Sequence, residues 1–173
     1  MDPHTDNRNV TDEFKGKSED EIIAELDARG VQVEIAIENT LRDFNMGSIV
    51  RTANAFGIRT VHVVGRKQWN KRGAMMTDKY LHTQYHESFS DLRTYANSKQ
   101  YRIVAVDNVP GSIPLEDSTK ESTSILLFGQ EGPGLSKEAL QEADTIVAIE
   151  QSGSTRSLNV GVAAGIAIYT WLH

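Results

Sequence analysis

The sequence predicts an α/β fold with a mostly parallel sheet that carries helices on both faces. Short runs of β-branched and apolar residues alternate with longer segments of helical periodicity. Glycine-rich turns stand where a predicted strand gives way to a helix, which is where open sheets of this class bind ligands. The length of 173 residues suits one domain with a substantial core.

The N-terminal part of the chain differs from the rest. Residues 1–17 are polar, rich in aspartate and without periodicity, so we expect a disordered acidic arm there. Residues 18–173 are then a single domain. Residues 1–38 hold 11 acidic and 4 basic residues, a net charge of −7, against −6 for the whole chain. The acidity therefore belongs to the N-terminal part.

Local patterns predict the elements of the first half of the domain. Ser18 and Glu21 form a capping box at the first helix, and Gly57 ends the second. In chain order we expect a helix over 18–30, a strand over 31–37, a helix over 47–56, a strand over 60–64, a long loop over 65–82 and a helix over 90–98, capped by Ser90.

The second half continues the alternation. We expect a strand over 102–106, a turn-rich stretch over 107–121, a short buried strand over 125–128, a helix over 136–143 capped by Ser136, a strand over 145–149 and a long apolar helix over 158–172. No internal repeat interrupts this order.

Composition excludes several classes of protein. The chain has no cysteine, which excludes disulfides, thiolate catalysis and cysteine-ligated metals. No apolar run approaches the roughly 20 residues of a membrane span, and the first residues do not resemble a signal peptide. We therefore expect a cytoplasmic protein with no membrane segment.

A basic loop weakens the argument that the net negative charge makes against nucleic-acid binding. A charge of −6 argues against non-specific binding of nucleic acid. The loop over 65–82, however, contains only Asp78 as an acid, and Trp69 and Tyr80 lie among its basic residues, which are Arg66, Lys67, Lys71, Arg72 and Lys79. This composition suits phosphate contacts and base stacking. A solvated loop with no ligand is the alternative.

Three glycine-punctuated segments carry the candidate chemistry. The second, FGQEGPGLS over 128–136, follows a buried strand and lets a ligand approach the backbone, or it is a plain tight turn. It lacks the Lys-Ser/Thr of a P-loop and the spacing of a dinucleotide fingerprint. Glu131 is its notable polar group.

The other two segments are each open to two interpretations. In STRSLNVG over 154–161, Ser157 and Asn159 stand at the start of the last helix, as caps or as part of an anion site. In NMGSIVR over 45–51, Asn45 suits a helix cap. Arg51 has apolar neighbours, and it either lies on a polar surface or pairs with an anionic group.

Together the three segments resemble the signature motifs of the SpoU (TrmH-like) branch of the SPOUT RNA methyltransferases. The shared features, over about residues 31–172, are an N-x-G-x-x-x-R helix, a G-x-E-G-x-G-L-S turn and an S-L-N-V helix start, in this order. The resemblance implies a C-terminal trefoil knot, S-adenosylmethionine as cofactor, and a homodimer with its active site at the subunit interface. The implied reaction methylates a ribose 2′-hydroxyl of tRNA or rRNA.

The resemblance also assigns roles to residues. It implies catalytic roles for Arg51, Asn45, Glu131, Ser157 and Asn159. It implies cofactor contacts at Val106, Asp107, Gly129, Glu131, Gly132, Ile149, Gln151, Ser157 and Leu158. We expect RNA contacts from Arg66, Lys67, Trp69, Lys71, Arg72, Lys79 and Arg156.

The implied reaction needs no metal, because a sulfonium is already a good leaving group. An arginine has a pKa above about 12, so Arg51 is a poor base. We expect it to hold RNA phosphate and to stabilise the developing alkoxide. The chain departs from the family at Glu150-Gln151, where Pro-Met is usual, and at Gly161, where serine is usual. These changes affect the loop beside the cofactor.

Other functions compete with this hypothesis. A catalytically inactive RNA-binding module could keep the same fold, and an unrelated nucleotide-binding hydrolase could share the glycine turns. His82 and His86, with Glu87 adjacent, have a spacing that occurs in metal sites, but no third ligand stands in a motif, which favours a packing or surface role. The lack of a separate N-terminal RNA-binding domain leads us to expect a tRNA substrate.

Overall fold

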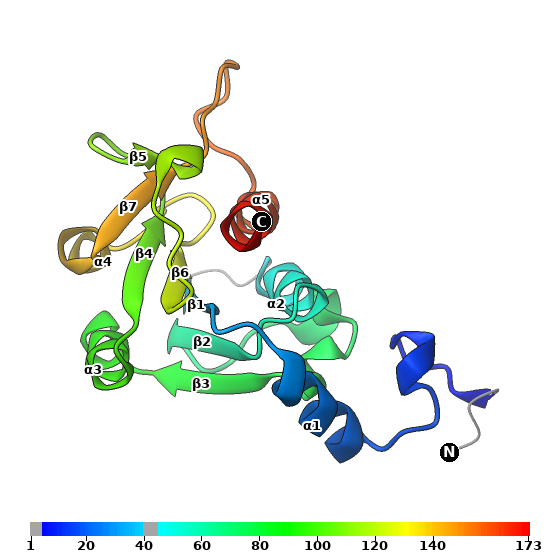
Figure 1. The fold of residues 1–173 in the computed structure, drawn as a ribbon. Coiled ribbons are helices and arrows are strands. Elements are labelled where there is room, and N and C mark those ends of the chain that lie inside the picture. The colour runs from blue at the N-terminus through cyan, green and yellow to red at the C-terminus, as the bar shows by residue number, and fades with distance from the viewer. Residues whose placement is uncertain (1–4, 40–44) are drawn as a thin grey trace.

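The computed structural model describes residues 5–39 and 45–173. Within these residues, one seven-stranded sheet has the order β3-β2-β1-β6-β4-β7-β5 (Figure 1). All neighbouring strands pair in parallel. The strands are β1 (Glu34–Asn39), β2 (Thr60–Gly65), β3 (His82–His86), β4 (Arg102–Val106), β5 (Ile113–Pro114), β6 (Ser124–Phe128) and β7 (Thr145–Ala148). The predicted α/β class is confirmed.

Helices cover both faces of this sheet (Figure 1). On one face, α2 (Met46–Ala55) and α5 (Val160–Leu172) pack on a core that includes Ile35 and Ile37 of β1. On the other face, α3 (Phe89–Lys99) and α4 (Lys137–Glu142) share a second core, and the Ala36 side chain belongs to it. The alternation of side chains along β1 therefore supplies both cores.

The polar residues that alternate along β1 do not face solvent. Glu34 and Glu38 are buried, because helices cover the second face as well. Each has partners: the Nε2 atom of His62 lies 2.7 Å from Glu34 Oε2, and Ser136 donates to both carboxylate oxygens of Glu38. The predicted strand over 31–37 exists, but it runs over Glu34–Asn39, and its polar residues have partners where alternation usually indicates solvent.

The remaining helices are short or peripheral. α1 (Glu19–Arg29) begins with the predicted capping box, in which Ser18 Oγ accepts from Glu21 N at 3.2 Å. One-turn 3₁₀ helices lie within the N-terminal residues, the basic loop and the turn-rich stretch: η2 (Asp12–Phe14), η3 (Lys71–Ala74), η4 (Thr77–Tyr80) and η5 (Leu115–Asp117). No helix in the described part of the chain is long and apolar enough to cross a membrane.

Several boundaries differ from the prediction, and the short strand β5 lies in the stretch expected to be turns. Ser88, not Ser90, caps α3, because Asp91 completes a capping box with it, and the Asp91 carboxylate accepts from Ser88 N at 3.0 Å. The residues of β3, HTQYH, were not predicted as a strand. β3 pairs only with β2 at the edge of the sheet. An edge strand needs no apolar run, so its sequence gives a weak signal.

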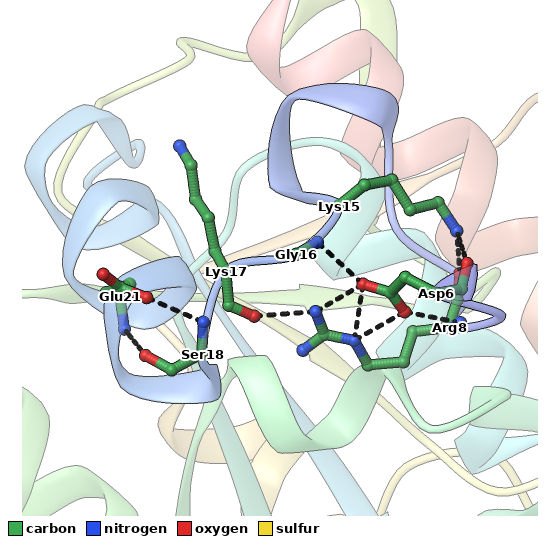
Figure 2. A network of polar contacts seen from close by, with 7 residues as sticks. All are labelled: Asp6, Arg8, Lys15, Gly16, Lys17, Ser18 and Glu21. Atoms are coloured by element: carbon green, nitrogen blue, oxygen red, sulfur yellow. Dashed lines mark hydrogen bonds and ion pairs between the residues drawn. The ribbon is translucent and has the colours of Figure 1, made fainter. Parts of the chain in front are cut away.

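The structure also corrects the expectation of a disordered arm. Residues 1–4 lie outside the described residues, and we call residues 5–17 the N-terminal arm. Its Phe14 is 5% exposed and packs with Ile22 of α1 and Tyr80 of η4. A carboxylate–guanidinium network around Asp6 also fixes the arm, as Figure 2 shows. One aromatic anchor and one buried carboxylate are sufficient for order without any periodic pattern.

Candidate cofactor and catalytic site

A cleft of about 260 Å³ lies at the carboxyl ends of β4, β6 and β7. This edge is where open parallel sheets bind ligands. All the residues expected to contact a cofactor line the cleft: Val106, Asp107, Gly129, Glu131, Gly132, Ile149, Gln151, Ser157 and Leu158. Segments far apart in the sequence therefore converge on one cleft.

Backbone hydrogen bonds close the glycine-rich turn after β6 into a loop. Some positions of this loop accept only glycine. Gln130 and Gly134 exchange backbone hydrogen bonds of 3.1 and 3.0 Å. A Cβ atom on Gly129 would lie 2.4 Å from the Gly134 carbonyl carbon, so no side chain fits there. Gly132 and Gly134 adopt φ of 103° and 72°, in the left-handed region. The turn thus presents backbone to the cleft.

Two carboxylates accept hydrogen bonds from this turn and fix its position. Asp107, at the end of β4, accepts from Leu135 N at 3.1 Å through Oδ2. Glu38, at the end of β1, accepts from Ser136 N at 2.7 Å and from Ser136 Oγ at 2.6 Å. Ser136 also caps α4, as predicted. The floor of the cleft is therefore fixed by charge-assisted bonds.

The catalytic candidates Asn45, Glu131 and Asn159 form one hydrogen-bonded cluster. Asn45 Nδ2 donates to Glu131 Oε2 in a short contact. Asn159 Nδ2 donates to Asn45 Oδ1 at 3.1 Å and to Glu131 Oε1 at 3.2 Å. We call these three residues the polar triad. Each comes from a different one of the three sequence segments.

Asn159 also caps α5, which confirms one of the two interpretations of its position. Its Oδ1 accepts from Gly161 N at 3.0 Å and from Val162 N at 3.2 Å. The side-chain oxygen caps the helix while the side-chain nitrogen joins the triad. α5 begins at Val160, two residues later than predicted. Ser157 lies before the helix, exposed and at the cofactor cleft.

Arg51 is not part of the cofactor cleft of this chain. It lies on α2, exposed, and has no hydrogen bond or ion pair to other described residues. It lines a separate cleft of about 370 Å³ together with Ser48, Thr52 and Phe56. The structure thus brings together four of the five catalytic candidates and places Arg51 elsewhere.

The basic loop is partly a structural element. Lys71 pairs with Asp78 at 2.8 Å, and its Nζ lies 5.5 Å from the centre of the Trp69 ring. Trp69 packs against the core. Tyr80 is buried in the cluster of the N-terminal arm, so the expectation that bases stack on it is wrong.

Cationic groups remain available on this loop and near the cofactor cleft. Arg66, Lys67 and Arg72 are exposed, while Lys79 lies 3.9 Å from Glu19. Arg156 lines the cofactor cleft itself.

Sequence reasoning missed residues that line the cleft beside the expected ones. They include Asn108 and Val109, which directly follow β4, and Val160 and Ala163 on the first turn of α5. Their position next to a strand end or a helix start is the signal that could have identified them.

A buried histidine cluster was also missed. His62 is 0% exposed, and its Nδ1 lies 2.9 Å from His86 Nε2. Tyr95 donates to Glu34 at 3.2 Å, and burial together with the Glu34 charge raises the pKa of Tyr95 to about 12. His82 instead pairs with Asp27 at 2.9 Å. His82 and His86 thus have separate partners.

The fold and the site define a class: a parallel α/β domain with a cofactor cleft built from glycine turns at the carboxyl edge of its sheet. The family model named SpoU rRNA Methylase family matches residues 32–169. The chain belongs to this family of RNA methyltransferases, and the resemblance seen in the three segments is confirmed.

Individual relatives agree with this assignment. A tRNA (guanosine(18)-2′-O)-methyltransferase of Borreliella burgdorferi is 30% identical over 166 residues, which cover 94% of this chain and 74% of the relative. The structure is similar to the TrmH/SpoU tRNA modifying enzyme of A. aeolicus, with a TM-score of 0.77, 24% identity and coverage of 88% and 80%. An AdoMet-bound rRNA methyltransferase of Sinorhizobium meliloti gives a TM-score of 0.72 at 26% identity, and covers 80% of this chain and 55% of its own.

Proposed function

We propose that this protein transfers a methyl group from S-adenosylmethionine to the 2′-hydroxyl of a ribose in tRNA. The observation that carries the proposal is the polar triad, in which Asn45, Glu131 and Asn159 meet beside the cofactor cleft. The similarity to a tRNA (guanosine(18)-2′-O)-methyltransferase supports tRNA over rRNA as the substrate.

The residues of the cleft fit the donor molecule. Val106, Ile149 and Leu158 supply apolar walls that suit an adenine ring. The Asp107 carboxylate lies at the strand end, where it can accept from hydroxyl or ammonium groups. If Gly132 carried a Cβ atom, no other atom would lie within 4 Å of it, so the backbone there is open to a ligand. When bound, the sulfonium of the donor supplies the methyl group.

The protein's residues contribute positioning and electrostatics. With the donor bound, its methyl group would pass to the ribose 2′-oxygen, and the electron pair of the broken carbon–sulfur bond would remain on sulfur. The hydroxyl proton passes to solvent. Asn45 and Asn159 hold the Glu131 carboxylate in one orientation at the edge of the cleft. Such preorganised polar groups lower the barrier without metal.

A homodimer explains why Arg51 lies apart from the cofactor cleft. α5 exposes a row of apolar side chains at Val162 (53%), Ile166 (39%) and Tyr169 (55%). Such a row beside α2 is typical of an interface. We propose that two copies pair through α2 and α5, so that Arg51 of one copy serves the cofactor held by the other. There it holds RNA phosphate and stabilises the alkoxide.

The C-terminal knot belongs to the same proposal. α5 contacts η5, and Trp171 Nε1 donates to the Glu121 carbonyl at 3.1 Å, so the last helix packs against the turn-rich stretch. This packing supports a C-terminal segment threaded through the loop over 107–123.

Calorimetry and a transfer assay together test the function. The purified protein should bind S-adenosylmethionine and should move its labelled methyl group to unmodified tRNA transcripts. Binding of RNA and cofactor with no transfer would indicate an inactive RNA-binding module. Binding of ATP or NAD in place of S-adenosylmethionine would indicate an unrelated nucleotide enzyme.

A further inference from the structure

A second and larger cleft lies between the N-terminal arm and α2. Its volume is about 540 Å³, against about 260 Å³ for the cofactor cleft. Its polar lining includes Asn9 and Thr11 of the arm, Arg29 of α1, and Arg51 and Asn54 of α2, and Glu13, Thr77 and Tyr80 line it as well. We call it the arm cleft. A cleft of this size lies within the usual range for a bound ligand of nucleotide size.

The arm wall of this cleft is held rigidly. The Asp6 carboxylate accepts from Arg8 Nε at 2.9 Å and from Gly16 N at 3.0 Å, and Arg8 Nη2 donates to the Lys17 carbonyl at 2.7 Å (Figure 2). Lys15 Nζ donates to the carbonyl oxygens of Asp6 and Arg8. These bonds close residues 6–17 into a loop, so Asn9 and Thr11 are presented on a fixed support.

An aromatic contact joins the same loop to the body of the domain. Phe14 is buried against Ile22 and Tyr80. The Arg29 guanidinium lies 4.9 Å from the centre of the Phe14 ring and pairs with Glu13 at 2.7 Å. The arm thus docks onto α1 and η4 and leaves open the space toward α2.

The chemistry of the lining indicates an anionic ligand with hydrogen-bonding edges. Arg29 and Arg51 bring two guanidinium groups, while Glu13 is the acid of the lining and is already paired with Arg29. Asn9 and Asn54 add amide groups that both donate and accept, while the Thr11 hydroxyl, which donates to Glu13 Oε1 at 3.3 Å, can accept. Guanidinium groups bind phosphate, and amides pair with the edges of bases.

We propose that the arm cleft holds an unstacked nucleotide of the RNA substrate, one that flanks the methylated ribose. Arg51 lines both this cleft and the one that faces the proposed interface, so it connects the two. The inference rests on the proposed function, since it places the flanking nucleotide by means of Arg51. The arm then contributes to the choice of RNA site.

Replacement of both arm groups tests this inference. Asn9→Ala combined with Thr11→Ala removes exposed side chains, and Asn7→Ala is the matched control, because Asn7 is exposed on the same loop but does not line the cleft. We expect the double variant to raise the KM and the Kd for tRNA transcripts roughly tenfold, since each lost hydrogen bond weakens binding several-fold. The kcat and the affinity for S-adenosylmethionine should stay at the control values.

A photo-crosslinking amino acid supplies a readout that does not depend on turnover. Placed at position 9, it should join to a single tRNA nucleotide next to the modified ribose, whereas at position 7 it should give little product. The proposal for the arm cleft alone would be overturned by two results in a protein that methylates tRNA. The double variant and the Asn7→Ala control would have the same KM, and positions 9 and 7 would crosslink equally. A wild-type protein that binds no RNA and transfers no methyl group would overturn the proposed function as well.

Discussion

Asn159 Nδ2 lies 3.1 Å from Asn45 Oδ1, although 114 positions separate the two residues in the sequence. The same nitrogen reaches Glu131 at 3.2 Å, while Asn159 Oδ1 caps α5. One side chain therefore joins the start of the last helix to the glycine turn and to the start of α2. Loss of this side chain has two separable consequences.

Asn159→Ser separates capping from the contact with the triad. Serine caps helices about as well as asparagine, so the melting temperature should change little. The donor to Glu131 is lost, and a hydrogen bond to a charged group is worth about 1.5–3 kcal/mol, so turnover should fall roughly 10- to 100-fold. Asn159→Ala should in addition lose about 1 kcal/mol of stability with the cap. Thermal melts and steady-state kinetics measure both effects; full activity of Asn159→Ser would show that the triad is dispensable.

Arg51→Ala should reduce the rate of methyl transfer at least 100-fold, because the alkoxide loses its cationic partner. The Kd for S-adenosylmethionine should not change, since Arg51 does not line the cofactor cleft of its own chain and, in the proposed dimer, contacts the RNA rather than the donor. Arg51→Lys should recover only part of the activity, because lysine lacks the planar fork. Calorimetry with the donor and kinetics with tRNA distinguish the two effects. An unchanged rate for Arg51→Ala would remove this residue from the mechanism.

Val162→Glu tests the proposed interface through α5. The side chain is 53% exposed in the single chain, so the substitution removes little internal packing. A buried carboxylate at a dimer interface is costly, and we expect a monomer that still binds S-adenosylmethionine but no longer methylates. Lys99→Glu, on the exposed end of α3, is the control and should stay dimeric. Light scattering after gel filtration gives the mass; a dimeric, active Val162→Glu would place the interface elsewhere.

His86 should make the fold sensitive to mild acid. Burial, together with the neighbouring His62, lowers the pKa of His86 below its ordinary value of 6.5, while Asp91 raises it in part. The unfolded chain then binds more protons than the fold as the pH falls through 6.5, so stability is lost on that side. His86→Gln should reduce the loss of melting temperature between pH 7.5 and 5.5 that the wild type shows. Parallel slopes for the two proteins would contradict this role for His86.

Local chemistry explains which parts of this structure the sequence could predict. The bounds of β4 match the prediction because a buried strand is an apolar run with clear ends. The residues at the cofactor cleft came from the resemblance, which placed them at the glycine turns and strand ends that line this edge of the sheet. Their chemical roles came from the resemblance, since spacing alone left Asn159 as either a cap or a site residue.

Tertiary contacts explain the failures. The burial of Tyr80 depends on Phe14, which lies far from it in the sequence, and the arm is ordered by the same contact together with the Asp6 network. No local pattern reports such a contact. β3 was missed because a polar edge strand is defined by its neighbour β2 rather than by its own residues. The position of Arg51 outside the cofactor cleft likewise follows only from the packing of α2.

The most direct measurement is the fate of a labelled methyl group. Purified protein, S-adenosylmethionine labelled in its methyl group and unmodified tRNA transcripts are incubated together. The digested nucleosides are separated by chromatography and fragmented in a mass spectrometer, which distinguishes a methylated ribose from a methylated base. The proposed function predicts a labelled 2′-O-methylnucleoside with the wild type and none with Arg51→Ala. Label on a base, or no label although the donor binds, would contradict it.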